Sequence, residues 1–336
     1  MDYKKFWRPC LVIVLIFASV LGLVNWYMDP LWCWPERSHS WNQAQEYPSE
    51  QQEKTNRLYF GSAKYDSLIL GSSGVTAINA EDIVPNGYNY AAAGVFPRDY
   101  VMYANFFREI MGKDPDIIVL GVEFSETDRT ERDKNAKQKE DYIGNTTSFL
   151  YRERELFSIS LFEISRKNFR HARLQDIDYK YDRQGHHILL PQSDIVQRIE
   201  KFQKSEIDQL TAYQYDEDYK RELQNLRDAF PYARFVVFTV PNSAPVYQTM
   251  IDEGKWNDYE RWLTDVVEVF GTVHHMMWNN SFTEDVTNYR DPVHFSTSAG
   301  KNLVDALKGM ETDFDMVLTP ENLQENLHFL RGNAGL

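Results

Sequence analysis

The sequence predicts an α/β fold in three layers, with a mostly parallel sheet and helices on both of its faces. The pattern of apolar residues along the chain supports this prediction. Short apolar runs of strand length alternate with amphipathic helical stripes along most of the chain. Alternation of this kind favours parallel pairing, because each helix carries the chain back across a face of the sheet. An apolar segment near the N-terminus also predicts a transmembrane helix ahead of the folded part.

The N-terminal run from Cys10 to Met28 contains no formally charged residue, and only Ser19 and Asn25 interrupt it. A run of this length spans a bilayer as a helix, so we predict a transmembrane anchor over residues 10–28. A cleaved signal peptide is the alternative. The run is long for a signal sequence and no convincing small-x-small cleavage site follows it, which favours an uncleaved anchor.

The charges that flank the anchor predict its orientation. Lys4, Lys5 and Arg8 precede the apolar run, whereas Asp29 follows it. The positive-inside rule then places residues 1–9 in the cytoplasm as a short tail. We therefore expect a single-pass protein of the inner or cytoplasmic membrane, with its folded domain outside the cytoplasm, in the periplasm or the extracellular space.

Composition narrows the possible partners. The 336-residue chain has a formal net charge of -14. This acidity argues against a nucleic-acid partner, which requires a basic surface. The two cysteines, Cys10 and Cys33, lie at opposite ends of the predicted anchor, too far apart for a disulfide. The length suits one large domain with additions better than two equal domains.

The elements follow in order along the chain. Residues 29–58 are polar and rich in Glu, Gln and Ser, which predicts a tether. Apolar runs predict strands at residues 67–70, 88–92, 117–122, 234–240 and 272–277. Apolar residues at helical spacing predict helices around residues 100–111, 223–230, 259–270 and 303–310, the last one capped by Ser296-Thr297-Ser298.

The middle of the chain interrupts this regular pattern. Residues 125–141 are densely charged and predict a solvated loop, and mixed periodicity continues to about residue 219. We interpret residues 126–220 as a helical insertion into an α/β domain of residues 59–312, with residues 313–336 as a C-terminal extension.

Two short motifs carry the chemistry. The first strand runs into Gly71-Ser72-Ser73-Gly74, and Asp291 lies three positions before His294, just ahead of the last predicted helix. A serine hydroxyl needs a base within hydrogen-bond reach, and a carboxylate fixes the tautomer of that base. Ligands of parallel sheets bind beyond the carboxyl ends of the strands, where both motifs are expected to lie. We predict a nucleophilic site of Ser73, His294 and Asp291, with Ser72 as the alternative nucleophile.

These motifs resemble those of the SGNH (GDSL-like) hydrolase superfamily: an apolar strand ending in Gly-x-Ser, the glycine block Asn89–Gly94, and Asp-x-x-His followed by Phe-Ser and a helix. The anchor with Tyr27-Met28-Asp29-Pro30, and Gly-Ser-Ser in place of Gly-Asp-Ser, is similar to bacterial membrane-anchored members. Those proteins act beside membrane-bound O-acyltransferases, in D-alanyl transfer or in alginate and cellulose acetylation. The resemblance covers about residues 59–310 without the insertion, and implies a flavodoxin-like arrangement.

The resemblance assigns roles to individual residues. It aligns Ser73 with the nucleophile and first oxyanion donor, Gly94 with the second donor, and Asp291 and His294 with the rest of the triad. One block departs, because Glu123 stands where the family usually has Asn. A carboxylate facing an oxyanion would be repulsive unless protonated or turned away, so either two backbone amides suffice or another amide such as Asn242 contributes.

The expected function is transfer of an acyl group, most simply acetyl, to or from a hydroxyl of a cell-surface polysaccharide through an acyl-enzyme. A membrane-bound O-acyltransferase partner is implied by the resemblance only. One alternative is an ester hydrolase that removes such groups. The other is a non-catalytic assembly or polymer-binding subunit. Glu123 is the feature that favours this alternative. No cofactor is expected. No metal site is expected either, because the pairs His186-His187 and His274-His275 each offer one ligand at most on a strand.

Overall fold

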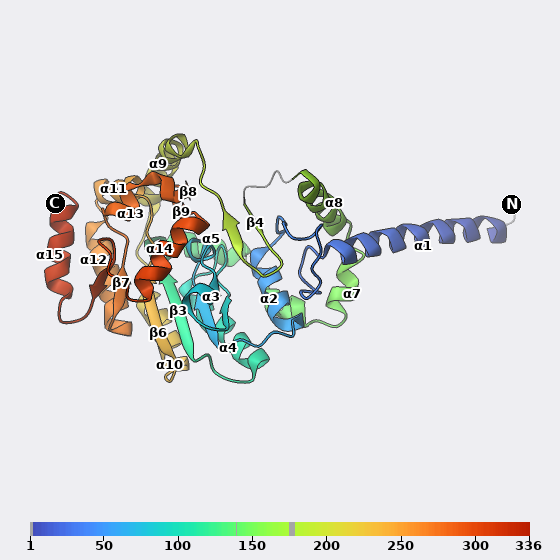
Figure 1. The fold of residues 1–336 in the computed structure, drawn as a ribbon, viewed down its shortest axis with the longest axis horizontal. Helices are drawn as coiled ribbons and strands as arrows, with labels where there is room; N and C mark the ends of the chain where they lie inside the picture. The colour runs from blue at the N-terminus through green and yellow to red at the C-terminus, as the bar shows by residue number, and fades with distance from the viewer. Residues whose placement is uncertain (1–2, 139, 175–178) are drawn as a thin grey trace. The chain divides into compact units, whose positions relative to one another are not determined.

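The structure is a computed structural model that describes residues 3–138, 140–174 and 179–336. The chain divides into two compact units. Unit 1 comprises Met1–Ala63 and Asp141–His186, and unit 2 comprises Lys64–Glu140 and His187–Leu336. Helices and strands of both units are labelled in Figure 1.

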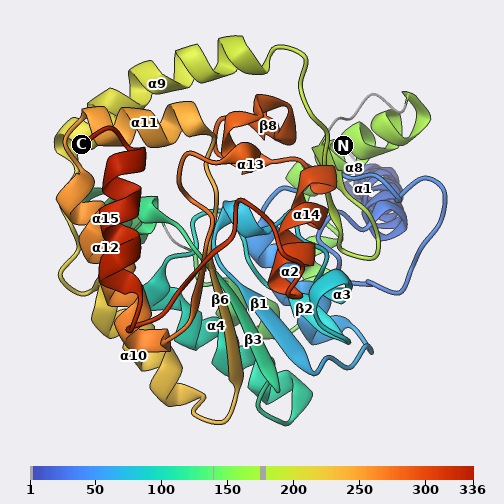
Figure 2. The ribbon, with the colours of Figure 1, turned by 60° about the vertical axis from the view of Figure 1, so that its left-hand side comes forward.

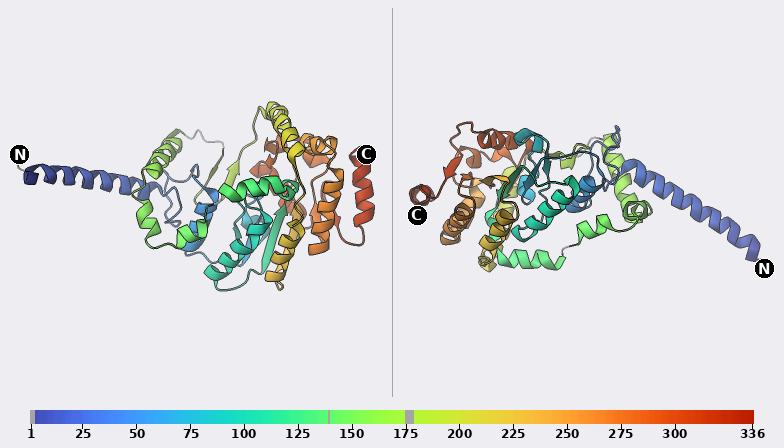
Figure 3. Two further views of the ribbon diagram at one scale, coloured as in Figure 1. Left: turned by 180° about the vertical axis from the view of Figure 1, so that it is seen from behind. Right: turned by 90° about the horizontal axis from the view of Figure 1, so that it is seen from below.

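Unit 1 is built on the long helix α1 and on short helices that follow it. Its elements are α1 (Tyr3–Met28), α2 (Glu50–Phe60), α6 (Tyr142–Thr147), α7 (Tyr151–Glu155), α8 (Ile159–Leu174) and the short strand β4 (Tyr179–Tyr181). Within α1, the segment Trp7–Met28 is long and apolar enough to cross a membrane. Most of this helix projects away from the rest of unit 1, and large side chains from Leu11 to Phe17 are exposed (Figure 3).

The C-terminal end of α1 is held by polar contacts. Asn25 is buried in α1 and donates through Nδ2 to the carbonyls of Leu156 and Ser158, both at 2.9 Å. Ser165 of α8 donates to Asn25 Oδ1 at 3.0 Å. These bonds satisfy a polar group that would otherwise be costly in an apolar helix.

The prediction that residues 29–58 form a tether is wrong, because this segment is folded. Ser49 caps α2, accepting a hydrogen bond from the N–H of Gln52. Most residues of α2 are buried despite being polar, and Asn56 donates to the carbonyl of Leu31 at 2.8 Å. Asp29 forms a buried ion pair with Arg183 at 2.7 Å. Polar composition indicated a solvated linker, but internal hydrogen bonds and ion pairs compensate for the burial of these groups.

Unit 2 contains a six-stranded sheet in the order β10-β7-β6-β3-β1-β2. The strands are β1 (Ser67–Leu70), β2 (Gly87–Asn89), β3 (Ile117–Val122), β6 (Arg234–Thr239), β7 (Val273–His275) and β10 (Met316–Leu318). All neighbouring pairs are parallel except β10 with β7. The central strands β1 and β3 are almost wholly buried, as their continuous apolar runs predict. Figure 2 shows β2, β1, β3 and β6 side by side.

Helices surround this sheet. The α-helices of unit 2 are α3 (Ala80–Ile83), α4 (Pro97–Met111), α5 (Arg129–Gln138), α9 (Ile195–Ala212), α10 (Tyr219–Ala229), α11 (Ala244–Asp252), α12 (Trp256–Phe270), α13 (Ser281–Glu284), α14 (Thr297–Leu307) and α15 (Leu323–Asn333). Helices α4, α10 and α12 pack in succession, and α3 packs on α14. Figure 1 shows α14 and α3 in front of the sheet, and the view from behind in Figure 3 shows α4 and α10. The predicted α/β class with a mostly parallel sheet is confirmed.

Three predictions about particular segments differ from the structure. The charged stretch that predicted a loop contains helix α5, because Asp128 accepts from the N–H of Thr130 at its start and ion pairs such as Lys134–Glu131 (2.6 Å) lie along it. Residues 126–220 are not one insertion, since residues 141–186 belong to unit 1 and the rest to unit 2. The supposed C-terminal extension supplies β10, which completes the sheet, and α15.

Candidate active site

The serine loop follows the buried strand β1 directly. Gly71 has a φ of +150°, and a side chain there would meet Val75 and the carbonyl of Gly121. After this turn, Ser73 begins the 3₁₀ turn η1 (Ser73–Val75). Glycine therefore allows the chain to turn sharply at the carboxyl end of the strand and to present Ser73 at the rim of the sheet.

The Asp-x-x-His motif lies in a small hairpin. Strands β8 (Tyr289–Asp291) and β9 (His294–Phe295) are antiparallel, and their register pairs Asp291 with His294. The turn between them is fixed to the start of α11, because both N–H and Oγ of Ser243 donate to the carbonyl of Pro292, at 3.1 and 2.8 Å. Short connections and these bonds hold the imidazole and the carboxylate together.

Ser73, His294 and Asp291 form one hydrogen-bonded chain. His294 Nε2 lies 2.8 Å from Ser73 Oγ, although the two residues are 221 positions apart in the sequence. His294 Nδ1 lies 2.8 and 2.9 Å from the two carboxylate oxygens of Asp291. This is the order of contacts required for a histidine to act as base toward a serine while a carboxylate orients its ring.

The electrostatic state of Asp291 fits that arrangement. Burial alone would raise the pKa of Asp291, but the hydrogen bond and charge of His294 and the N–H groups of Val293 and His294 outweigh it and hold the pKa below its ordinary value. The carboxylate is therefore ionised at neutral pH and able to stabilise an imidazolium at His294.

The three predicted oxyanion donors, Ser73, Gly94 and Asn242, line one cavity. This cavity has a volume of about 250 Å³, and Gly94 and Asn242 contribute to its wall. Within the described residues, the N–H groups of Ser73 and Gly94 donate no hydrogen bond. Asn242 is 7% exposed, and its Oδ1 has no partner there. Free donors beside a nucleophile are what stabilisation of a developing oxyanion requires.

Glu123, the residue that departs from the family pattern, is turned onto the serine loop. Its Oε1 accepts a hydrogen bond from Ser72 Oγ and another, 3.1 Å long, from the N–H of Gly74. The backbone N–H of Glu123 in turn donates to Glu126 Oε2 at 3.1 Å. Glu123 therefore bonds to the residues on both sides of Ser73, to the hydroxyl of Ser72 and to the backbone N–H of Gly74, and Ser72 contacts this carboxylate instead of His294.

Sequence reasoning missed the helical wall of the cavity. Phe202, Glu206 and Gln209 of α9 line it, from within the segment that the sequence placed in an insertion. Burial raises the pKa of Glu206 to about 7, and the carboxylates of Asp128 and Glu131 add to the rise. Nothing in the periodicity of α9 distinguishes these residues, because only tertiary packing brings α9 against α11 and β8.

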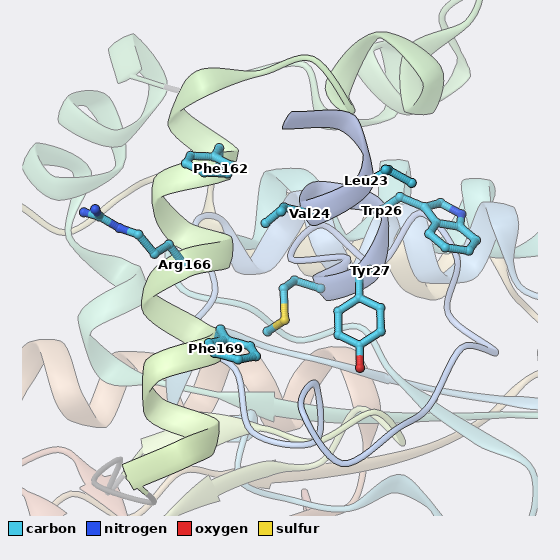
Figure 4. Close-up of a pocket in the computed structure, with 8 residues that line it drawn as sticks. Leu23, Val24, Trp26, Tyr27, Phe162, Arg166 and Phe169 are labelled. Carbon is cyan, nitrogen blue, oxygen red and sulfur yellow. The ribbon is translucent and has the colours of Figure 1, made fainter. Parts of the chain in front are cut away.

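A larger cavity lies in unit 1, between the end of α1 and α8 (Figure 4). It measures about 500 Å³ and is lined by apolar and aromatic side chains such as Met28, Phe162 and Phe169, with Arg166 at its edge. None of the described residues that line it is a serine, histidine or carboxylate, whereas Ser73 lines the cavity in unit 2.

The paired histidines are engaged in other contacts. His275 is fully buried and lies 3.0 Å from Thr239 Oγ1 and 2.8 Å from Tyr259 OH, and burial lowers its pKa to about 3. His274 contacts Asp315 at 2.7 Å. Within the described part of the chain, no three His, Cys, Asp or Glu residues are grouped to hold a metal ion.

Comparison of this chain with protein-family models, with curated proteins and with solved structures finds no match.

Proposed function

We propose that this protein is an SGNH-type serine O-acyltransferase that acts outside the cytoplasm on a cell-surface polysaccharide. The observation that carries the proposal is the hydrogen-bonded chain from Ser73 Oγ through His294 to Asp291, at the carboxyl ends of parallel strands. The acyl group is proposed to be acetyl, and the acceptor a hydroxyl of the polymer.

In the proposed reaction, Ser73 Oγ attacks the carbonyl carbon of an acyl ester while His294 Nε2 takes its proton. The oxyanion is stabilised by the N–H groups of Ser73 and Gly94 and by the amide of Asn242. When the tetrahedral intermediate collapses, His294 returns the proton to the leaving alcohol. The acceptor hydroxyl then attacks the acyl-serine as His294 removes its proton. When this second tetrahedral intermediate collapses, the bond between the acyl group and Ser73 Oγ breaks and His294 returns the proton to Ser73 Oγ.

The placement of Glu123 supports an active site over a decayed one. A carboxylate that accepts from Ser72 and Gly74 stabilises the serine loop and has its charge partly compensated by these donors. The non-catalytic alternative depends on a Glu123 carboxylate directed at the oxyanion, whereas this carboxylate bonds to Ser72 and Gly74.

Membrane attachment and a partner complete the proposal. Trp7–Met28 of α1 is proposed to anchor the chain with its N-terminus in the cytoplasm. A membrane-bound O-acyltransferase is proposed to supply the acyl group, an expectation that comes from the resemblance to SGNH-like membrane proteins.

Covalent labelling tests the nucleophile. The full-length chain in detergent is treated with a fluorophosphonate, digested and examined by mass spectrometry. The adduct is expected on Ser73 and is lost in Ser73→Ala and in His294→Ala, whereas Ser72→Ala still carries it on Ser73. An adduct on Ser72, or none on the parent chain, would refute the proposed nucleophile.

Product analysis then separates the two enzymatic alternatives. The chain is given an acetyl ester donor with and without an oligosaccharide acceptor, and acetylated sugar and free acetate are quantified. Acetylated sugar that depends on Ser73 supports the transferase. Acetate alone, at a rate unaffected by the acceptor, would assign the same site to a carbohydrate ester hydrolase.

A further inference from the structure

The cavity beside Ser73 is strongly acidic. Among the described residues that line it are the four carboxyl groups of Glu123, Glu126, Glu131 and Glu206, and no lysine, arginine or histidine. Carboxylates in a cavity with walls of low dielectric constant attract a cation and repel an anion that enters from solvent.

Three of these carboxyl groups already have partners. Glu123 accepts from Ser72 and Gly74, Glu126 accepts from Tyr100 OH at 2.7 Å, and Glu131 pairs with Lys134 at 2.6 Å. Their positions are therefore explained by the protein itself. Burial raises the pKa of Glu126 well above its ordinary value, so the negative charge of the cavity comes from the other carboxyl groups.

Glu206 is different. It projects from α9 to the cavity, is half-buried, and has no hydrogen bond or ion pair with any residue that the structure describes. A partly buried carboxylate without a partner is destabilising, and a ligand that supplies a positive charge removes this penalty.

Asn242 provides an independent observation. Its side chain lines the same cavity and is more than nine-tenths buried, yet its Oδ1 accepts no hydrogen bond within the described residues. Buried amides are almost always hydrogen-bonded, so an orphan oxygen at a cavity wall indicates a donor on a ligand. The amide can serve the oxyanion through Nδ2 and the ligand through Oδ1.

We propose that this cavity binds a sugar unit with a free, protonated amine, so that the acceptor polymer contains hexosamine that is not N-acetylated. This proposal rests on the proposed function and names its substrate class. Glu206 receives the ammonium group, Asn242 Oδ1 accepts from the sugar, and Phe96 and Phe202 supply apolar walls. Uronic acid polymers are excluded by charge, because their carboxylates would face an acidic wall.

Binding to a catalytically inert chain tests this proposal. Full-length Ser73→Ala in detergent is titrated by calorimetry with four trisaccharides of matched length: glucosamine, N-acetylglucosamine, glucose and glucuronic acid. The glucosamine trimer is expected to bind about tenfold more tightly than the N-acetylated trimer, the size of one charge-assisted hydrogen bond. The glucuronic acid trimer is expected to bind most weakly.

A charge-neutral variant identifies the responsible residue. Adding Glu206→Gln is expected to reduce the preference for glucosamine about five- to tenfold and to leave glucose binding unchanged. Glu200→Gln is the matched control, because Glu200 is exposed on the same helix and does not line the cavity. It is expected to retain the full preference.

The outcomes separate this inference from the proposed function. Equal or tighter binding of the N-acetylated, glucose or glucuronic acid trimer overturns the amine-bearing ligand, as does an unchanged preference in Glu206→Gln. The panel on Ser73→Ala alone decides the matter if the double variant does not fold. Amine-selective binding in a protein whose parent chain is not labelled at Ser73 would refute the acyl-transfer chemistry while retaining the ligand class.

Discussion

Ser72 and Ser73 are adjacent in the sequence but make different hydrogen bonds. The backbone of Ser72 is extended, and its Oγ donates to Glu123. Ser73 begins a 3₁₀ turn, and its Oγ meets His294 Nε2 at 2.8 Å. A change of backbone conformation between the two residues therefore directs the hydroxyl of Ser73 to His294 and that of Ser72 to Glu123.

Glu123 gives a test at the residue scale. Replacement of Glu123 by alanine is expected to lower the free energy of unfolding by about 1–3 kcal/mol, because the buried N–H of Gly74 loses its acceptor. Glu123→Gln keeps an acceptor oxygen and is expected to lose less. Denaturant unfolding of the two variants measures the difference.

The same pair of variants distinguishes a positioning residue from a purely structural one. The rate of labelling at Ser73 is expected to fall in Glu123→Ala and to be largely restored in Glu123→Gln. Glu311→Ala is the control, since Glu311 is exposed and distant in sequence from the loop. Equal stability and equal labelling in all three variants would contradict the role given to Glu123.

At the scale of elements, the carboxyl ends of the parallel strands form the site. Ser73 follows β1, Gly94 follows β2, Glu123 follows β3 and Asn242 follows β6. The hairpin β8–β9 brings His294 to the same edge. Close packing of the serine turn against β3 depends on Gly121, where a side chain would meet Val75 and would lie 2.8 Å from Phe238.

Gly121→Ala is therefore expected to destabilise the protein by about 1–3 kcal/mol, because the added methyl overpacks the contact between β3 and η1. Labelling at Ser73 is expected to slow as well. Gly332→Ala in α15 is the matched control, since no atom of the described residues that could clash lies within 4 Å of the added methyl. Alanine favours helix, so about 0.5–1 kcal/mol of added stability is expected. Thermal or denaturant unfolding compares them, and a stabilised Gly121→Ala would contradict this account of the turn.

At the scale of the whole molecule, acidic groups determine how stability depends on pH. Burial raises the pKa of Glu206 and of Glu222 from 4.5 to about 7. The folded state therefore favours their protonated forms. Their contribution to stability is complete below the ordinary pKa and is lost as the pH rises through about 7.

This linkage predicts the effect of neutralising Glu206. Glu206→Gln is expected to raise the free energy of unfolding by about 1–2 kcal/mol at pH 8 and to change it little at pH 5, after allowance for partial exposure of the carboxylate. Denaturant unfolding at the two pH values measures this. Glu200→Gln is expected to show the pH dependence of the parent chain. A Glu206→Gln variant with that same dependence would show that Glu206 is not perturbed.

The exposed apolar helix also gives a prediction at this scale. Phe17 lies near the middle of Trp7–Met28 and is 57% exposed. Phe17→Arg is expected to oppose membrane insertion by about 2.5–3.5 kcal/mol and to release a large share of the chain on carbonate extraction of membranes. Phe17→Leu is expected to remain in the membrane fraction. Release of the parent chain under these conditions would contradict a membrane-spanning α1.

Most of the sheet could be predicted from local pattern. The strands at residues 67–70 and 117–122 agree with the structure in both limits, because continuous apolar runs bounded by turns admit few alternatives. Helix α5 and the folded segment around α2 could not be predicted in this way. Their residues are polar, and ion pairs and buried hydrogen bonds that form only in the folded chain stabilise them.

The sequence by itself determined the α/β class, the apolar N-terminal helix and the short motifs around Ser73 and His294, because each depends on residues close together in the chain. Only the tertiary structure decided that Ser73 and His294 meet, that Glu123 supports the serine loop, and that α9 adds Glu206 to the cavity. Such contacts join residues tens to hundreds of positions apart, and packing of the elements, not local propensity, brings them together.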